Sequence, residues 1–201
     1  MPTPEEITKN HDWNPPEGES VFVDGGPTTR PVAVVPYDPA WPELFAVVDG
    51  RVREALGSRV VDLAHVGSTA VPGLPAKPII DADLTVADSA DEDSYVPALE
   101  AAGFRLVIRE RGWHEHRMLT TDEPPTNLHV FSPECPETIR HRLFRDWLRD
   151  HPDDLARYRD VKLVAAVDST AAGEHVMDYN RRKQPVIREI YDRIFRAHGL
   201  L

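Results

Sequence analysis

The sequence feature that most constrains the fold is an apolar segment carrying two aspartates. Residues 79–86 read Ile-Ile-Asp-Ala-Asp-Leu-Thr-Val. Because successive strand side chains point to opposite faces, Asp81, Asp83 and Thr85 share one face, and the other face takes Ile80, Ala82, Leu84 and Val86. Two carboxylates about 7 Å apart repel each other, and a divalent cation such as magnesium would neutralise them. The alternative is a strand whose outer face is simply polar.

The apolar periodicity of the chain predicts an α+β fold, a small mixed β-sheet flanked by helices with a helical C-terminal part. We divide the chain into an N-terminal extension at 1–30, expected to be partly flexible, an α/β core at 31–135, and helices of the same domain at 136–201. We expect strands at 32–35, 60–66, 79–86, 104–108, 113–119 and 127–131. We expect helices from an entry at 38–43 through 44–56, at 95–102, from 137 to the break at His151-Pro152, at 155–166, and through 187–195.

Charge and hydropathy exclude several classes of protein. The net charge is −11, and residues 1–100 hold six basic against 18 acidic side chains, so binding of a nucleic acid is not expected. A small nucleotide remains possible, because a few local cations can hold it. No apolar run approaches the roughly 18 residues of a membrane span, and the N-terminus MPTPEEITKN lacks the basic and apolar segments of a leader. We therefore expect a cytoplasmic protein without a membrane partner.

A small loop precedes the acidic strand and suits a phosphate ligand. Gly67 and Ser68 follow an expected strand, and twelve residues separate them from Asp81. Glycine lets the backbone approach a phosphate closely, and serine adds a hydroxyl to the exposed amides. Gly-Ser, a dozen residues and Asp-x-Asp on a strand resemble the signature of the nucleotidyltransferase-fold superfamily, the polymerase-β-like group. The full string HVGSTAVPGLPAKPIIDADLTV resembles the GrpB family within it.

Further segments carry the same resemblance over about residues 32–198. They are VVPYDPAWPELF, NLHVF, FRDWLRDHPDDLARYRDVK, and Tyr179 with Lys183. The resemblance implies a nucleotidyltransferase-like fold and transfer of a nucleoside monophosphate from a nucleoside triphosphate, with ATP the expected donor, to an unidentified small-molecule acceptor with Mg²⁺ or Mn²⁺. The alternatives are a non-catalytic nucleotide- or metabolite-binding module of this fold, and a metal-dependent biosynthetic enzyme using the same site. The oligomeric state stays open.

The resemblance also exposes a departure from the superfamily pattern. Active members carry a third carboxylate on a neighbouring strand, whereas the corresponding strand here holds Asn127 and His129 on one face. We expect His129 to act with Asp81 and Asp83 as a metal ligand or as the general base. Glu115 is the alternative source of the missing carboxylate.

The remaining candidates are side chains that would contact the nucleotide. Lys77 lies between the loop and the acidic strand, where a compact cation suits a triphosphate. Strand alternation puts His114 and His116 on the face opposite to Glu115 and Arg117, and the resemblance implies that Arg117 is an inward-facing anion contact. Pro185 suggests a kink or a late start of the last helix. The expected nucleotide-binding residues are Gly67, Ser68, Thr69, Lys77, Arg117, Lys162, Tyr179 and Lys183, with His65, Arg145 and Tyr158 as weaker candidates.

Overall fold

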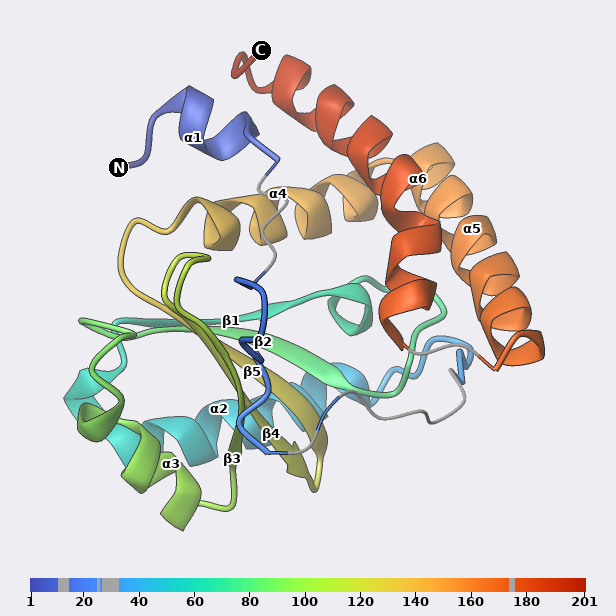
Figure 1. The fold of residues 1–201 in the computed structure, drawn as a ribbon. Coiled ribbons are helices and arrows are strands. Elements are labelled where there is room, and N and C mark those ends of the chain that lie inside the picture. The colour runs from blue at the N-terminus through green and yellow to red at the C-terminus, as the bar shows by residue number, and fades with distance from the viewer. Residues whose placement is uncertain (11–14, 25, 27–32, 174–175) are drawn as a thin grey trace.

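The computed structural model describes residues 1–10, 15–24, 26, 33–173 and 176–201 (Figure 1). Over these residues the chain forms one five-stranded sheet and six α-helices, which confirms the expected α+β class. The strands are β1 (Asp62–Val66), β2 (Ile80–Thr85), β3 (Arg105–Glu110), β4 (His116–Asp122) and β5 (Pro125–Phe131). The helices are α1 (Pro4–Thr8), α2 (Trp41–Leu56), α3 (Val96–Ala101), α4 (Pro136–Asp150), α5 (Pro152–Ala171) and α6 (Val176–Ala197).

The strands run in the order β1-β2-β5-β4-β3. Only β2 and β5 are parallel among these neighbours, so the sheet is mixed as expected. The β2–β5 register sets Asp81 beside Asn127 and Asp83 beside His129. Paired residues of neighbouring strands share a face of the sheet. The register therefore gathers these four polar side chains on one face.

The opposite face of the sheet carries the larger apolar core. Helices α2 and α3 cover it, as Figure 1 shows below the sheet. Apolar residues of α2 recur at helical spacing, so one stripe of the helix is buried against the strands. The alternation expected for β2 holds, because its apolar side chains enter this core. The buried residues that β2 and α2 contribute are Ala82, Leu84, Val48, Val52 and Leu56.

Helix α4 covers the polar face, and α5 and α6 pack beside it (Figure 1). A second apolar cluster holds these helices together through Leu148, Ile190 and Ile194. The short helix α1 also joins this layer, because Arg140 of α4 donates a 2.7 Å hydrogen bond to the Ile7 carbonyl. Within the described parts of the chain, no helix is long and apolar enough to cross a membrane.

Two expectations about single elements were wrong, and a third was narrowed to one of its two alternatives. Val32 of the expected strand 32–35 lies outside the described residues, and Val35 forms only an isolated bridge to Ala76. The expected strand at 113–119 begins only at His116, because the residues before it form a turn. Pro185 lies inside helix α6, so the helix does not start late, and a kink at Pro185 stays a prediction.

Candidate functional site

The two aspartates of β2 lie on the polar face of the sheet, as alternation predicted. The side chain of Asp81 is 32% exposed, whereas that of Asp83 is 1% exposed. Gly67 ends β1 beside Asp81 with a φ of +67°. A Cβ built on this glycine would lie 2.5 Å from Asp81 Oδ2. The position needs glycine for its backbone conformation and for this close approach.

His141 of α4 neutralises Asp83, and the sequence analysis missed it. Its Nδ1 lies 2.9 Å from Asp83 Oδ2. Burial alone would lower the pKa of His141, but the charge and hydrogen bond of Asp83 outweigh burial and raise it to about 9. The sequence did hold a signal for His141, because it lies one helical turn before the candidate Arg145 and so shares its helix face. In the structure Arg145 contacts β1 from that face.

Two side chains of β5 lie beside Asp81. Asn127 donates a 2.8 Å hydrogen bond to its Oδ1, and His129 Nε2 lies 3.9 Å from the same oxygen. Burial raises the pKa of Asp81, but the contacts with His129 and Asn127 and the charge of Lys77 outweigh burial and lower it. His129 thus lies beside the carboxylate as predicted, while its role in catalysis stays a prediction.

Three lysines from different parts of the chain lie near enough to Asp81 for its charge to act on them. Lys77 precedes β2, Lys162 lies on α5 and Lys183 on α6, and the charge of Asp81 acts on all three. Burial, and for Lys162 also the charge of Lys183, lowers the pKa of Lys162 to about 6. Burial lowers the pKa of Lys183 to about 8. Lys162 also donates a 2.6 Å hydrogen bond to the Pro75 carbonyl.

Two tyrosines line this cluster of lysines, which we call the lysine cluster (Lys77, Lys162 and Lys183). The Nζ atoms of Lys183 and Lys77 lie 4.1 and 5.8 Å from the centre of the Tyr179 ring. Lys162 Nζ lies 5.2 Å from the centre of the Tyr158 ring. Burial raises the pKa of Tyr158 to about 12, although the neighbouring Ser68 acts to lower it. The structure therefore brings the Gly67-Ser68 loop, the lysines and both tyrosines together around Asp81.

Arg117 and Glu115 are not part of this group. Arg117 pairs with Val130 in the sheet, so it faces α2 and α3 and not the aspartates. Its guanidinium is buried and paired with Glu92 at 2.7 Å and Glu115 at 3.2 Å. Glu115 lies in the turn before β4 with a φ of +49°, so the alternation assumed for residues 113–117 does not apply. The expectation that Arg117 contacts an anion beside the aspartates was therefore wrong.

Three other candidates contact protein groups. His65 lies on the core face of β1, where its ring stacks on Phe45 and its Nε2 lies 3.0 Å from Thr69 Oγ1. Burial lowers the pKa of His65 to about 4. Arg145 donates a 2.8 Å hydrogen bond to the His65 carbonyl. These side chains hold β1, the loop and α4 together, and the structure does not direct them at a ligand.

The donor set does not fit a resident metal centre. Within residues 1–10, 15–24, 26, 33–173 and 176–201, no three His, Cys, Asp or Glu side chains are arranged to hold an ion. Asp83, which would be the second carboxylate ligand, is already ion-paired with His141. A protonated imidazole has no lone pair to offer a metal. The expected site of Asp81, Asp83 and His129 therefore lacks a free second carboxylate.

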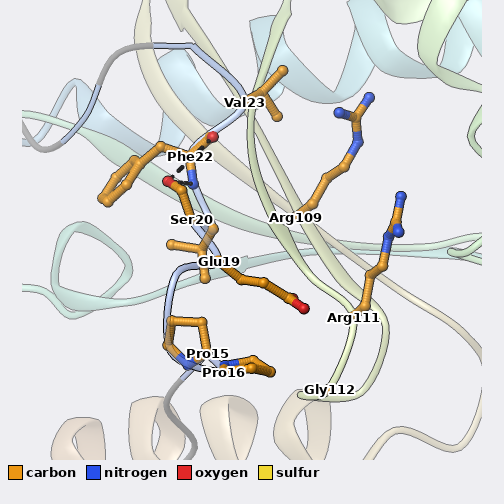
Figure 2. A pocket seen from close by; sticks show the side chains of 10 residues that line it. Pro15, Pro16, Glu19, Ser20, Phe22, Val23, Arg109, Arg111 and Gly112 are labelled. Carbon is orange, nitrogen blue, oxygen red and sulfur yellow. Dashed lines mark hydrogen bonds between the residues drawn. The ribbon is translucent and has the colours of Figure 1, made fainter.

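A cavity lies at the far edge of the sheet. It has a volume of about 410 Å³ and is lined by residues 15–16 and 19–23 together with Arg109, Arg111 and Gly112 (Figure 2). Val21 and Val23 make backbone hydrogen bonds with Arg109 and Val107, so this part of the N-terminal extension covers the β3 edge. The residues that line this cavity include no member of the lysine cluster and neither aspartate of β2.

Comparison with known proteins identifies the family. The model of the family described as GrpB protein matches residues 31–193. The UPF0157 protein BH1888 of Halalkalibacterium halodurans is 44% identical over 167 residues, covering 83% of this chain and 84% of that protein. A dephospho-CoA kinase of Mycolicibacterium paratuberculosis is 33% identical, covering 81% of this chain but 46% of that protein. The crystal structure of the conserved protein GrpB from Enterococcus faecalis matches with a TM-score of 0.71 and 26% identity, covering 83% of this chain and 99% of that one. The chain belongs to the GrpB family.

Proposed function

We propose that the chain binds a nucleoside triphosphate through the lysine cluster and transfers its nucleoside monophosphate group to a small-molecule acceptor. The observation that carries the proposal is that two buried lysines and the partly exposed Lys77 share one carboxylate, Asp81. Lys162 is 2% exposed and Lys183 is 8% exposed. Burying a charge is costly unless a partner compensates it. Burial keeps Lys162 largely neutral near pH 7, and a polyanionic ligand would raise the pKa of the buried lysines and so complete the site.

The residue types favour a polyphosphate. Lysine is a compact point charge that binds phosphate well. The chain has only four lysines, and three of them lie in this cluster, while the other basic residues are arginines. Ser68 and the backbone of Gly67 lie at the same place and add hydrogen-bonding groups.

The polar face supplies the groups that transfer requires. Asp81 and His129 lie beside the lysine cluster, where His129 Nε2 would accept the proton of the acceptor hydroxyl. Magnesium or manganese would enter as the counter-ion of the triphosphate, since Mg²⁺ is commonly held by one or two carboxylates together with substrate phosphates. In this proposal the metal is part of the substrate. The alternative is a module that binds the nucleotide without transferring it.

Two measurements separate these alternatives. Calorimetry with ATP and the other triphosphates tests binding, and pyrophosphate release across a library of hydroxyl, amine and carboxyl acceptors tests transfer. Lys183→Met should weaken triphosphate binding at least tenfold, whereas Lys9→Met should not, because Lys9 is exposed and lies outside the cluster. Equal affinity of both variants would reject the polyphosphate site. Binding without pyrophosphate release would favour the non-catalytic module.

A further inference from the structure

A line of hydrogen-bonded side chains leads from the edge of the sheet to His129, which lies beside Asp81. Glu110 Oε2 of β3 lies 2.7 Å from His116 Nδ1 of β4. His116 Nε2 lies 3.0 Å from His129 Nδ1 of β5. The two imidazole rings are stacked with centroids 5.2 Å apart, so the geometry is held by packing as well.

The order of protons along this line follows from the chemistry of its first member. A carboxylate only accepts hydrogen bonds, so His116 Nδ1 must carry the proton that Glu110 receives. His116 is 3% exposed, and burial lowers its pKa to about 4, so its imidazole is neutral near pH 7. A neutral imidazole has one N–H, which leaves His116 Nε2 as an acceptor.

The same reasoning then determines the tautomer of His129. Its Nδ1 must donate to His116 Nε2, so a neutral His129 has its free lone pair on Nε2. That nitrogen lies 3.9 Å from Asp81 Oδ1, beyond hydrogen-bonding distance. Without this line of contacts, His129 would donate from Nε2 to Asp81, because a carboxylate is the stronger acceptor.

We propose that Glu110 and His116 are positioning residues that hold His129 as its Nδ1–H tautomer and so keep Nε2 available as the base beside Asp81. The tautomer of His129 does not depend on the proposed function. Only the use of His129 as the base in the transfer step rests on it. In the transfer step, the acceptor oxygen forms a bond to the α-phosphorus and its proton passes to His129 Nε2. The bond from the α-phosphorus to the bridging oxygen breaks, and pyrophosphate leaves with the electron pair.

The tautomer can be measured without any substrate. Long-range ¹H–¹⁵N NMR spectra of the full-length protein with ¹⁵N-labelled histidine report which ring nitrogen carries the proton. Loss of a signal set in His129→Gln assigns that set. The informative variants are Glu110→Leu and His116→Phe. Each replaces one hydrogen-bonding side chain of the line by an apolar side chain of similar size. The matched control is Glu100→Leu, an exposed position on α3 across the sheet.

We expect the parent and Glu100→Leu to show neutral His129 protonated on Nδ1, and both informative variants to move that proton to Nε2. In transfer assays the two variants should lose about 10- to 100-fold in kcat, with KM for the triphosphate changed less than about twofold. Parent protein with Nε2 protonated, or variants with the tautomer unchanged, would overturn the inference. If the tautomer moves as expected but no acceptor yields pyrophosphate, the positioning role stands and the proposed transfer fails.

Discussion

His141 of α4 and Asp83 of β2 form an ion pair with 2.9 Å between Nδ1 and Oδ2. The pair joins the helical layer to the strand that carries both aspartates. It also occupies the carboxylate that would otherwise be the second ligand of a metal ion. The two partners lie 58 residues apart in the sequence. Because of this contact, the counter-charge of Asp83 comes from the protein itself and not from a metal ion.

The ion pair predicts a pH-dependent contribution to stability. The pKa of His141 is about 9 in the folded protein against an unperturbed value near 6.5. A raised folded pKa adds stability that is complete below about pH 6.5 and is lost as the pH rises through 9. We therefore expect the difference in Tm between the parent and His141→Gln to shrink from pH 6 to pH 10. Thermal unfolding at each pH measures it, and a constant difference would contradict the charged pair.

Removal of His141 should free Asp83 for a metal ion. His141→Asn takes away the competing cation, so the nucleotide-free variant should bind Mg²⁺ or Mn²⁺ at least tenfold more tightly than the parent does. The double variant His141→Asn with Asp83→Asn is the control and should lose that gain. Titration calorimetry with Mn²⁺ measures both. Equally tight metal binding by the parent would show that Asp83 is available despite its partner.

The lysine cluster predicts effects of opposite sign on stability and on binding. Lys183 is buried and its pKa is lowered to about 8, so its charge costs free energy in the folded protein. Lys183→Met should raise the free energy of unfolding near pH 7 by about 1–4 kcal/mol, while it weakens triphosphate binding. Denaturant unfolding and calorimetry test the two signs. A variant that loses stability would mean that Lys183 supports the fold.

Triphosphate binding should also depend on pH. As the pH rises through about 8, Lys183 loses its proton and its charge, so affinity for ATP should fall. At pH 7.5 binding should take up protons, because a bound anion raises the pKa of each buried lysine. Calorimetry in buffers of different ionisation enthalpy measures this uptake. Affinity independent of pH between 6.5 and 9 would exclude the buried lysines as the anion site.

Lys77 should distinguish long from short phosphate chains. Its amino group lies by Tyr179 and acts on Asp81, at the entrance to β2. If it contacts the terminal phosphates, Lys77→Ala should weaken ATP binding by at least tenfold and AMP binding by less than about threefold. Lys9→Ala serves as the control. Equal losses of affinity for ATP and AMP would show that Lys77 does not contact the terminal phosphates of ATP.

Gly67 should tolerate no side chain. Alanine there adopts a disfavoured backbone conformation and brings its Cβ within 2.5 Å of Asp81 Oδ2. Gly73→Ala is the matched control, since Gly73 has a φ of +79° but no atom within 4 Å of its Cβ position. We expect Gly73→Ala to cost about 1–2 kcal/mol and Gly67→Ala to cost more and weaken ATP binding. Equal costs would show that Asp81 can move aside.

Much of the fold could be predicted from local patterns. The alternation in β2, the helical spacing in α2 and the break at His151-Pro152 each depend on neighbours in the sequence, and the structure confirms them. The error at 113–119 arose because a short polar stretch does not distinguish a turn from a strand. Glu115 has a positive φ that no alternation pattern reveals.

The sequence by itself determined that Asp81 and Asp83 share a face and that a Gly-Ser loop precedes them, because strand alternation and glycine conformations are local properties of the backbone. Only the tertiary structure decided which charges meet these carboxylates. It placed His141 on Asp83 and gathered three lysines around Asp81, and it turned Arg117 to the other face. The physical reason is that helix packing and strand register, which act between distant segments, set these distances.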